Sequence, residues 1–151
     1  MKRIGIVGGG ASGMMAAIKA SNENTCVTLF EKNDKIGKKL LVTGNGRCNF
    51  TNLSMGEDYY YTDDDDFLKR ALEKFSNQDL IFFMTSLGLL IKEKNGYVYP
   101  ACEQASTVLD CLRLELKKRN VNLVTDAEVV KAAKKGETFK VTLSDGKTHE
   151  F

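Results

Sequence analysis

The sequence has little of what metal sites, membrane spans and nucleic-acid surfaces require. It holds one histidine and four cysteines without a C-x-x-C pair, so a zinc site is not indicated. No apolar run reaches membrane-spanning length, and the short apolar start lacks a signal-peptide cleavage pattern. The net charge of +2 gives no strong electrostatic footprint for nucleic acid. We therefore expect a cytoplasmic protein with reduced thiols and with no metal, membrane or nucleic-acid partner.

What is present is typical of a soluble α/β protein. The 151 residues fit one domain and can bury a core, with 42% hydrophobic and 28% charged residues. An apolar, β-branched run at Arg3–Val7 predicts a buried parallel strand. Glycines follow, then an amphipathic helix over Ala11–Ser21 and a second strand over Cys26–Phe30. This order predicts a β-α-β unit at the start of the chain.

The remainder predicts a helical and hairpin insertion, one more strand and a meander. Asn95-Gly96 is a strong hairpin signal, and Ser76 is expected to cap a helix. In the meander, Phe139, Val141 and Leu143 alternate with polar residues and are expected to face inward. The predicted elements are helices at Lys38–Val42, Phe67–Phe75, 77–87 and 106–120, a hairpin at 89–99, and strands at Val121–Val124, Glu128–Ala133, Thr138–Leu143 and Lys147–Phe151.

The run from Gly8 to Gly13 matches the pattern G-x-G-x-x-G between a predicted strand and a predicted helix. Gly8 would allow the tight turn, Gly10 would let a pyrophosphate approach the backbone, and Gly13 would let the helix pack on the strand. The N–H groups of Ala11, Ser12 and Gly13 would then face the phosphates. A tight turn without a ligand is the alternative.

Glu31 ends the second predicted strand, where a carboxylate can accept hydrogen bonds from ribose hydroxyls and disfavours a 2′-phosphate. A solvated strand end is the alternative. Lys32 is kept among the candidate cofactor residues, although a solvated charge explains it better than a phosphate contact does.

A second motif, rich in Lys, Gly and Asn, runs from Gly37 to Asn52. Gly44 and Gly46 suit positive φ or a close backbone approach to a ligand. The amides of Asn45, Asn49 and Asn52 can bind the edge of a heteroaromatic ring such as a flavin. An irregular surface loop is the alternative on composition alone.

The two motifs together resemble the BaiN-like flavoproteins, also described as aminoacetone-oxidase-like NAD(P)/FAD-dependent oxidoreductases. The resemblance lies in Ile4–Gly13, Glu31-Lys32 and Lys38–Asn52, and the later elements follow the same order. It implies an α/β fold, namely a Rossmann-like FAD-binding domain of glutathione-reductase type. It also implies an FAD site with NAD(P)H as a candidate electron donor.

The resemblance assigns cofactor roles residue by residue. The glycine turn would hold the pyrophosphate and Glu31 the adenosine ribose, and the backbone of Val129 would meet adenine. The ribityl and flavin side would be lined by Lys39, Leu40, Gly44, Gly46, Arg47, Cys48 and Asn49.

Members of this family are two to three times longer, so residues 1–151 are expected to be the N-terminal portion of a truncated FAD/NAD(P)-binding domain. The substrate domain and a last FAD-contacting segment would be absent, and the sheet edges left open could drive self-association.

The flavin would carry the redox step, either as hydride transfer from a nicotinamide or as oxidation of a small organic substrate with oxygen as acceptor. No general acid or base can be named. Arg47 could lower the pKa of Cys48, but a packing role for Cys48 under the flavin is favoured. His149 is expected to be exposed. Two alternatives remain open: an NAD-binding Rossmann dehydrogenase, and a non-catalytic fragment that binds adenine nucleotide or serves as an assembly module.

Overall fold

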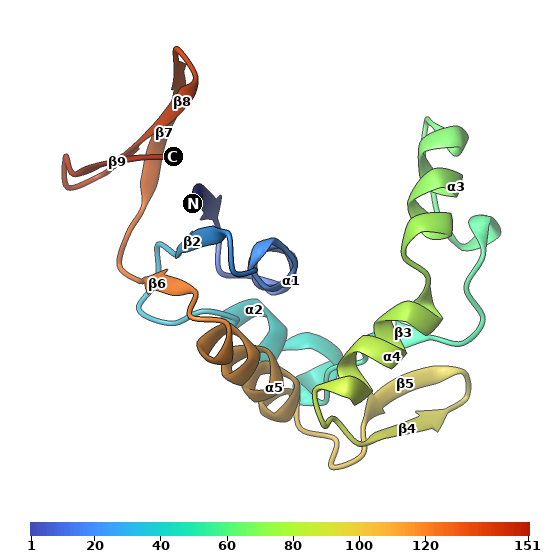
Figure 1. The fold of residues 1–151 in the computed structure, drawn as a ribbon. Coiled ribbons are helices and arrows are strands. Elements are labelled where there is room, and N and C mark those ends of the chain that lie inside the picture. Colours follow the sequence, from blue (N-terminus) through green and yellow to red (C-terminus); the bar gives the residue numbers. More distant parts are fainter. The chain divides into compact units, whose positions relative to one another are not determined.

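The computed structural model describes all residues from Met1 to Phe151 and divides them into two compact units (Figure 1). The first unit comprises Met1–Leu40 and Leu112–Phe151, and the second comprises Leu41–Cys111. Each unit is described by itself below.

The first unit is built on a parallel sheet. Strand β1 (Lys2–Val7) leads into helix α1 (Ala11–Ala20) and strand β2 (Thr25–Phe30), as the sequence predicts. Strand β6 (Asn122–Val124) adds to β2 in parallel, so the strand order is β1-β2-β6. This arrangement confirms the predicted Rossmann-like start, in which β1 and β6 are the two edges.

Helices cover this sheet through their apolar faces. Met14, Ala17 and Ile18 of α1 are fully buried, as their i, i+3, i+4 spacing predicts. Helix α5 (Ala105–Lys118) likewise buries Leu112 and Leu116 of the first unit.

Arg119 fastens the end of α5 to the end of α1. Its guanidinium donates to the carbonyl oxygens of Ile18 and Ser21, both at 3.3 Å, and to the carboxylate of Glu115. Glu115 is only 8% exposed, so this pair compensates a buried charge. The carbonyls of Ile18 in α1 and of its C-cap Ser21 thus accept hydrogen bonds from a side chain about one hundred residues away in the chain.

An antiparallel meander completes the first unit, in the order β7-β8-β9. Its strands are β7 (Val129–Lys135), β8 (Thr138–Leu143) and β9 (Thr148–Glu150). Val141 and Leu143 are buried against Phe30 of β2, as predicted.

Two expectations for the meander are wrong. Phe139 is 51% exposed, because it lies at the open end of β8, beyond the cluster around Phe30. His149 is half-buried, because its ring packs edge-on against Phe30 with centroids 4.9 Å apart.

The second unit holds the helical and hairpin insertion. Its sheet has the order β3-β5-β4, and Asn95 and Gly96 both take positive φ in the tight turn between β4 and β5. Its helices and strands are η1 (Thr43–Gly46), β3 (Thr51–Asn52), η2 (Glu57–Tyr59), α3 (Asp65–Lys74), α4 (Asn77–Ser86), β4 (Ile91–Lys94) and β5 (Tyr97–Pro100), while the short helix α2 (Lys38–Leu41) joins the two units.

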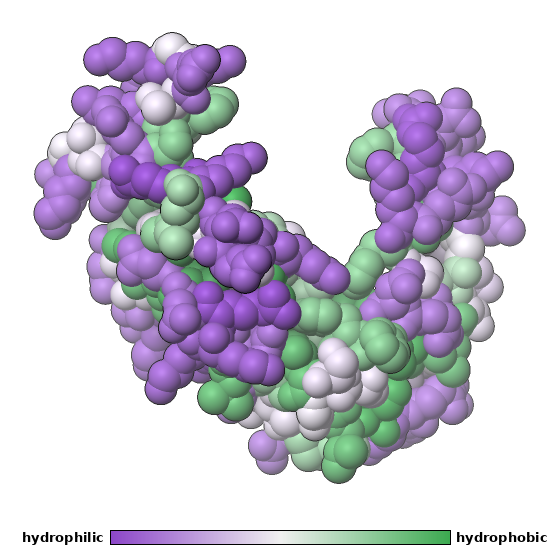
Figure 2. All heavy atoms as spheres, in the orientation of Figure 1, coloured by the Kyte–Doolittle hydropathy of each residue, from purple (hydrophilic) through white to green (hydrophobic).

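Side-chain caps begin the helices α3 and α4 of this unit. Asp64 accepts a hydrogen bond from the N–H of Phe67 at 2.7 Å and begins α3. Ser76 and Asp79 form a complete capping box at the start of α4. Figure 2 shows hydrophilic side chains over much of α3, which buries no residue completely.

Candidate functional site

The glycine turn between β1 and α1 is packed so closely that Gly9 and Gly13 leave no room for a side chain. Gly8 has a φ of +99° and donates to the carbonyl of Phe30 at 2.8 Å. A Cβ on Gly13 would lie 1.8 Å from the carbonyl oxygen of Gly8, where no atom fits. A Cβ on Gly9 would lie 2.5 Å from the side chain of Ile36. The turn therefore packs closely because these glycines carry no side chain.

The N-terminus of α1 is open. Gly10 is its N-cap, with extended backbone, and no side chain caps the first turn. Ala11 and Ser12 are exposed, and a Cβ on Gly10 would meet no atom within 4 Å. The N–H groups at the start of a helix carry a partial positive charge and attract anions. The structure thus places the predicted phosphate-binding residues around one open helix end.

Glu31 lies directly beside this turn. One carboxylate oxygen accepts the N–H of Gly9 at 2.7 Å, and the other accepts the N–H of Asn33 at 2.9 Å and its side-chain amide. Burial favours the neutral acid, yet these hydrogen bonds and nearby Lys32 outweigh it and lower the pKa below 4.5. Glu31 is therefore an ionised carboxylate that holds the backbone of the turn through Gly9 and places a negative charge beside it.

The remaining candidates of the first unit are diverse. Lys32 and Lys39 are exposed, whereas Leu40 is buried. Val129 begins β7, pairs with Leu143 and packs against the cluster around Phe30.

The second motif forms a tight, irregular turn. Gly44, Asn45, Gly46 and Cys48 all take positive φ, between 54° and 80°. Such values are unusual for Asn and Cys and mark a backbone that its surroundings constrain. The positive φ at Gly44 and Gly46 confirms the conformation that the sequence predicts for them.

The asparagine amides of this motif support the turn from inside. The amide of Asn49 donates to the carbonyls of Thr51 at 2.8 Å and Val98 at 3.2 Å. The side-chain oxygen of Asn52 accepts the N–H of Ser54 at 2.8 Å. These two amides are thus engaged within their own unit, which the sequence did not predict.

Cys48 is buried, in surroundings that favour the neutral thiol over the thiolate. It is 3% exposed, and burial raises the pKa of its thiol despite a hydrogen bond from Thr43. The expectation that Arg47 would lower this pKa is therefore wrong. Arg47 is instead within 4.0 Å of the carboxylate of Glu103, which also pairs with Lys92. The favoured packing role of Cys48 agrees with its burial.

Three supporting residues were missed from the sequence. Asn33 orients Glu31, Ile36 packs on Gly9, and Glu103 approaches Arg47. Asn33 could have been found, because short polar side chains commonly bond to groups two residues away. Glu103 gives no local signal, because the pair depends on how the second unit folds.

The cysteines form no disulfide, and no three His, Cys, Asp or Glu side chains come together in a metal-binding arrangement. No helix has the length and apolar character needed to cross a bilayer.

Comparison with known proteins gives relatives of several activities. The 3-dehydro-bile acid delta(4,6)-reductase of Clostridium scindens is 44% identical over 140 residues, which are 90% of this chain and 34% of that protein. The ribosomal RNA dihydrouridine synthase of Escherichia coli is 33% identical over 139 residues, 92% of this chain and 35% of that protein. The chain thus spans about a third of the length of these relatives.

Solved structures show the same fold at low identity. The Diels-Alderase PyrE3 superposes with a TM-score of 0.57 at 15% identity, covering 99% of this chain and 31% of PyrE3. Thermovibrio ammonificans THI4 gives a TM-score of 0.55 at 17% identity, covering 95% of this chain and 48% of THI4. These similarities confirm the Rossmann-like fold class and carry no further inference.

A family model described as the HI0933-like protein Rossmann domain matches residues 2–151. This match confirms the resemblance predicted from the two motifs. The chain belongs to the HI0933-like Rossmann domain family of flavoprotein oxidoreductases.

Proposed function

We propose that this chain binds FAD and that the diphosphate sits at the open N-terminus of α1. One observation carries the proposal: no side chain caps the start of α1, and the space beside Gly10, where a side chain would lie, is open. An anion there would accept hydrogen bonds from the N–H groups that no side chain satisfies. Ala11, Ser12 and Gly13 supply those groups.

Glu31 would orient the adenosine ribose. Asn33 donates twice to Oε1 and Gly9 donates once to Oε2, so one lone pair of Oε2 remains free to accept from a ribose hydroxyl. The lowered pKa keeps the group ionised at neutral pH, and its charge would repel a 2′-phosphate. The cofactor residues proposed for the first unit are Gly8, Gly10, Ala11, Ser12, Gly13, Glu31, Lys32, Lys39, Leu40 and Val129.

The flavin end of the cofactor is assigned to the second motif from its sequence. Gly44, Gly46, Arg47, Cys48 and Asn49 are proposed as its contacts, and their constrained backbone offers N–H and carbonyl groups with little conformational freedom to lose. Since the amide of Asn49 is engaged within the unit, we assign its contact to the backbone. The motif favours FAD over NAD, because a dehydrogenase that binds only NAD needs no second Gly- and Asn-rich loop.

A bound flavin would supply hydride transfer, and the chain would supply binding and orientation. The names of the relatives, a delta(4,6)-reductase and dihydrouridine synthases, both describe hydrogen added across a double bond. We therefore propose a reductase of unsaturated substrates, with NAD(P)H as electron donor. The small net charge of this chain favours a small molecule over ribosomal RNA as substrate.

The experiment is a titration of the purified chain with FAD, ADP and NAD, followed by thermal shift and by flavin absorbance near about 450 nm. FAD should stabilise the chain more than ADP or NAD does. A Gly10→Val variant should lose the response to both FAD and ADP, because the added side chain fills the space next to the helix end. Equal stabilisation by FAD and ADP would indicate an adenosine-only site and overturn the flavin assignment.

A further inference from the structure

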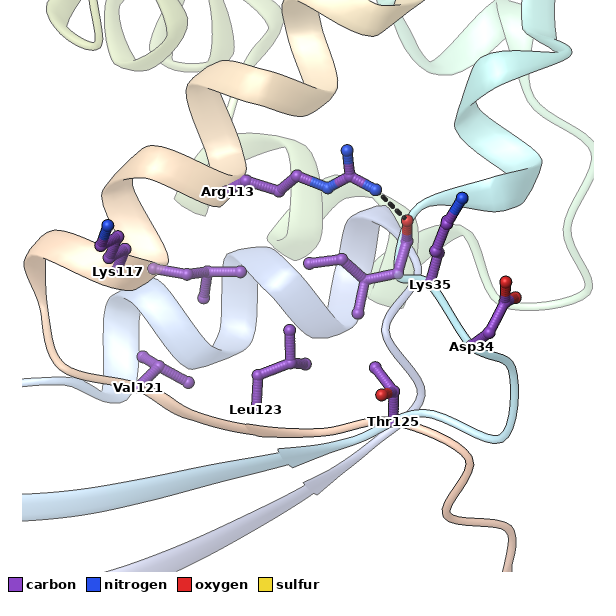
Figure 3. A pocket seen from close by; sticks show the side chains of 9 residues that line it. Asp34, Lys35, Arg113, Lys117, Val121, Leu123 and Thr125 are labelled. Carbon is purple, nitrogen blue, oxygen red and sulfur yellow. Dashed lines mark hydrogen bonds between the residues drawn. The ribbon is translucent and has the colours of Figure 1, made fainter.

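A groove of about 370 Å³ lies beside the edge strand β6 (Figure 3). Three short stretches line it, one each from the loop after β2, from α5, and from β6 and its flanks. All three belong to the first unit. None of the groove residues is among the proposed cofactor residues.

The floor of the groove is apolar. Along β6, alternate residues point to the same face of a strand, so Val121 and Leu123 both face the groove. Leu116 of α5 and Ile36 of the loop close the sides, and each is at most 5% exposed. Leu123 remains 44% exposed, although it lies in a strand of the main sheet. An apolar floor is thus left open to solvent.

The rim of the groove is cationic. Lys35, Arg113 and Lys117 surround the floor, and Arg113 is held there by a hydrogen bond of 3.2 Å to the carbonyl of Ile36 (Figure 3). Asp34 is the one acid of the lining, and it pairs with Lys38 at 2.6 Å. Positive charge over an apolar floor complements a ligand with an anionic head and an apolar body.

We propose that this groove binds an amphipathic organic anion, with the apolar body on Leu116 and Leu123 and the acid group at the cationic rim that Lys35, Arg113 and Lys117 form. The volume falls within the range of about 300–1,000 Å³ that small-molecule sites occupy. The basic side chains can follow the acid group, because their stems are flexible and their charged ends reach solvent. This site shares no residue with the proposed FAD site, although Ile36 of its lining packs on Gly9 of the glycine turn.

The test is a fluorescence titration of the purified chain with 8-anilinonaphthalene-1-sulfonate, compared with N-phenyl-1-naphthylamine, the same ring system without the sulfonate. The sulfonated probe should bind with one-to-one stoichiometry and more tightly than the uncharged probe. Backbone NMR shifts caused by the sulfonated probe should be confined to residues 34–36, 113–117 and 121–125.

Variants separate the charge of the rim from the floor. Lys117→Glu should weaken the sulfonated probe about tenfold and leave the uncharged probe unchanged, because only the anion contacts the rim. Lys118→Glu is the matched control, since Lys118 is the next residue, is 81% exposed and does not line the groove; its thermal unfolding also reports the loss of its 4.0 Å contact with Glu115. Leu123→Glu should weaken both probes.

Thermal unfolding of each variant shows whether the fold is kept. A folded Lys117→Glu variant that binds the sulfonated probe as tightly as the parent would overturn the proposal. Equal losses in the Lys117→Glu and Lys118→Glu variants, or NMR shifts outside the groove, would overturn it as well.

Discussion

Adding one methyl group at Gly13 or at Gly10 perturbs two different properties of the same turn. A Cβ on Gly13 would lie 1.8 Å from the carbonyl oxygen of Gly8, whereas real Cβ contacts essentially never fall below 3.0 Å. The backbone must therefore move, and overpacking of this kind costs about 1–3 kcal/mol. For a chain of this size the Gly13→Ala variant should lose about 2–12 °C in Tm.

Gly10→Ala should leave stability nearly unchanged. Its φ of −75° and ψ of −177° suit alanine, and the added Cβ meets nothing within 4 Å. Replacing a glycine N-cap by alanine costs about 0.5–1 kcal/mol, which the stiffer unfolded chain offsets by about 0.4–1 kcal/mol. The methyl group would, however, occupy the space assigned to the diphosphate. We expect FAD affinity to fall at least about tenfold, or about 1.4 kcal/mol.

Differential scanning fluorimetry and FAD titration of both variants measure the two effects separately. The reasoning about packing is refuted if Gly13→Ala melts at the temperature of the parent. The assignment of the diphosphate is refuted if Gly10→Ala melts normally and binds FAD as tightly as the parent does.

Three further experiments probe the interactions of Glu31, of Arg119 and of the cysteines. Glu31→Gln should cost about 1–3 kcal/mol at about pH 7, because an amide NH₂ then faces N–H donors. Since the pKa of Glu31 is lowered in the folded chain, this deficit is full above pH 4.5 and shrinks as the pH falls through the folded pKa, which urea unfolding at about pH 7 and about pH 3 would show. Arg119→Ala should cost about 2–4 kcal/mol in urea unfolding, because it leaves the buried carboxylate of Glu115 with only the exposed Lys118, at 4.0 Å, as a cationic partner, and Arg119→Lys should restore only part of this. In thiol labelling, Cys102 should react first and Cys48 only on unfolding, because a hydrogen bond from Thr107 lowers the pKa of the exposed Cys102 thiol and burial raises that of Cys48. A fast reaction of Cys48 in the folded chain would contradict its burial.

Local sequence signals predicted most of the fold. The apolar spacing of α1, the capping box of α4 and the Asn95-Gly96 turn all have causes within a few residues, and each is found as predicted. The order of elements then limits the topology, because a β-α-β unit pairs its strands in parallel.

The errors arose where distant segments meet. Phe139 continues the alternation of β8, but alternation cannot tell where the covering sheet ends. His149 packs on the ring of Phe30 in β2, and no residue pattern near His149 predicts this contact. Likewise, Arg47 was judged by its neighbour Cys48, whereas its carboxylate contact is Glu103, which comes from a loop 56 residues further along the chain.

The four glycines of the motif differ in whether the folded chain itself requires them. Gly8 needs its positive φ, Gly9 is covered by Ile36, and Gly13 packs on the backbone of Gly8, so each has a reason within the folded chain. Gly10 has none of these, because its backbone is ordinary and the space beside it is empty. A helix begun by Ser or Asp at that position would satisfy its own first N–H groups and gain stability. The chain forgoes this gain at the start of α1, whereas α3 and α4 begin with Asp64 and Ser76 as side-chain caps. Gly10 is therefore the glycine that a bound anion explains, whereas the other three glycines support the turn whether or not a ligand binds.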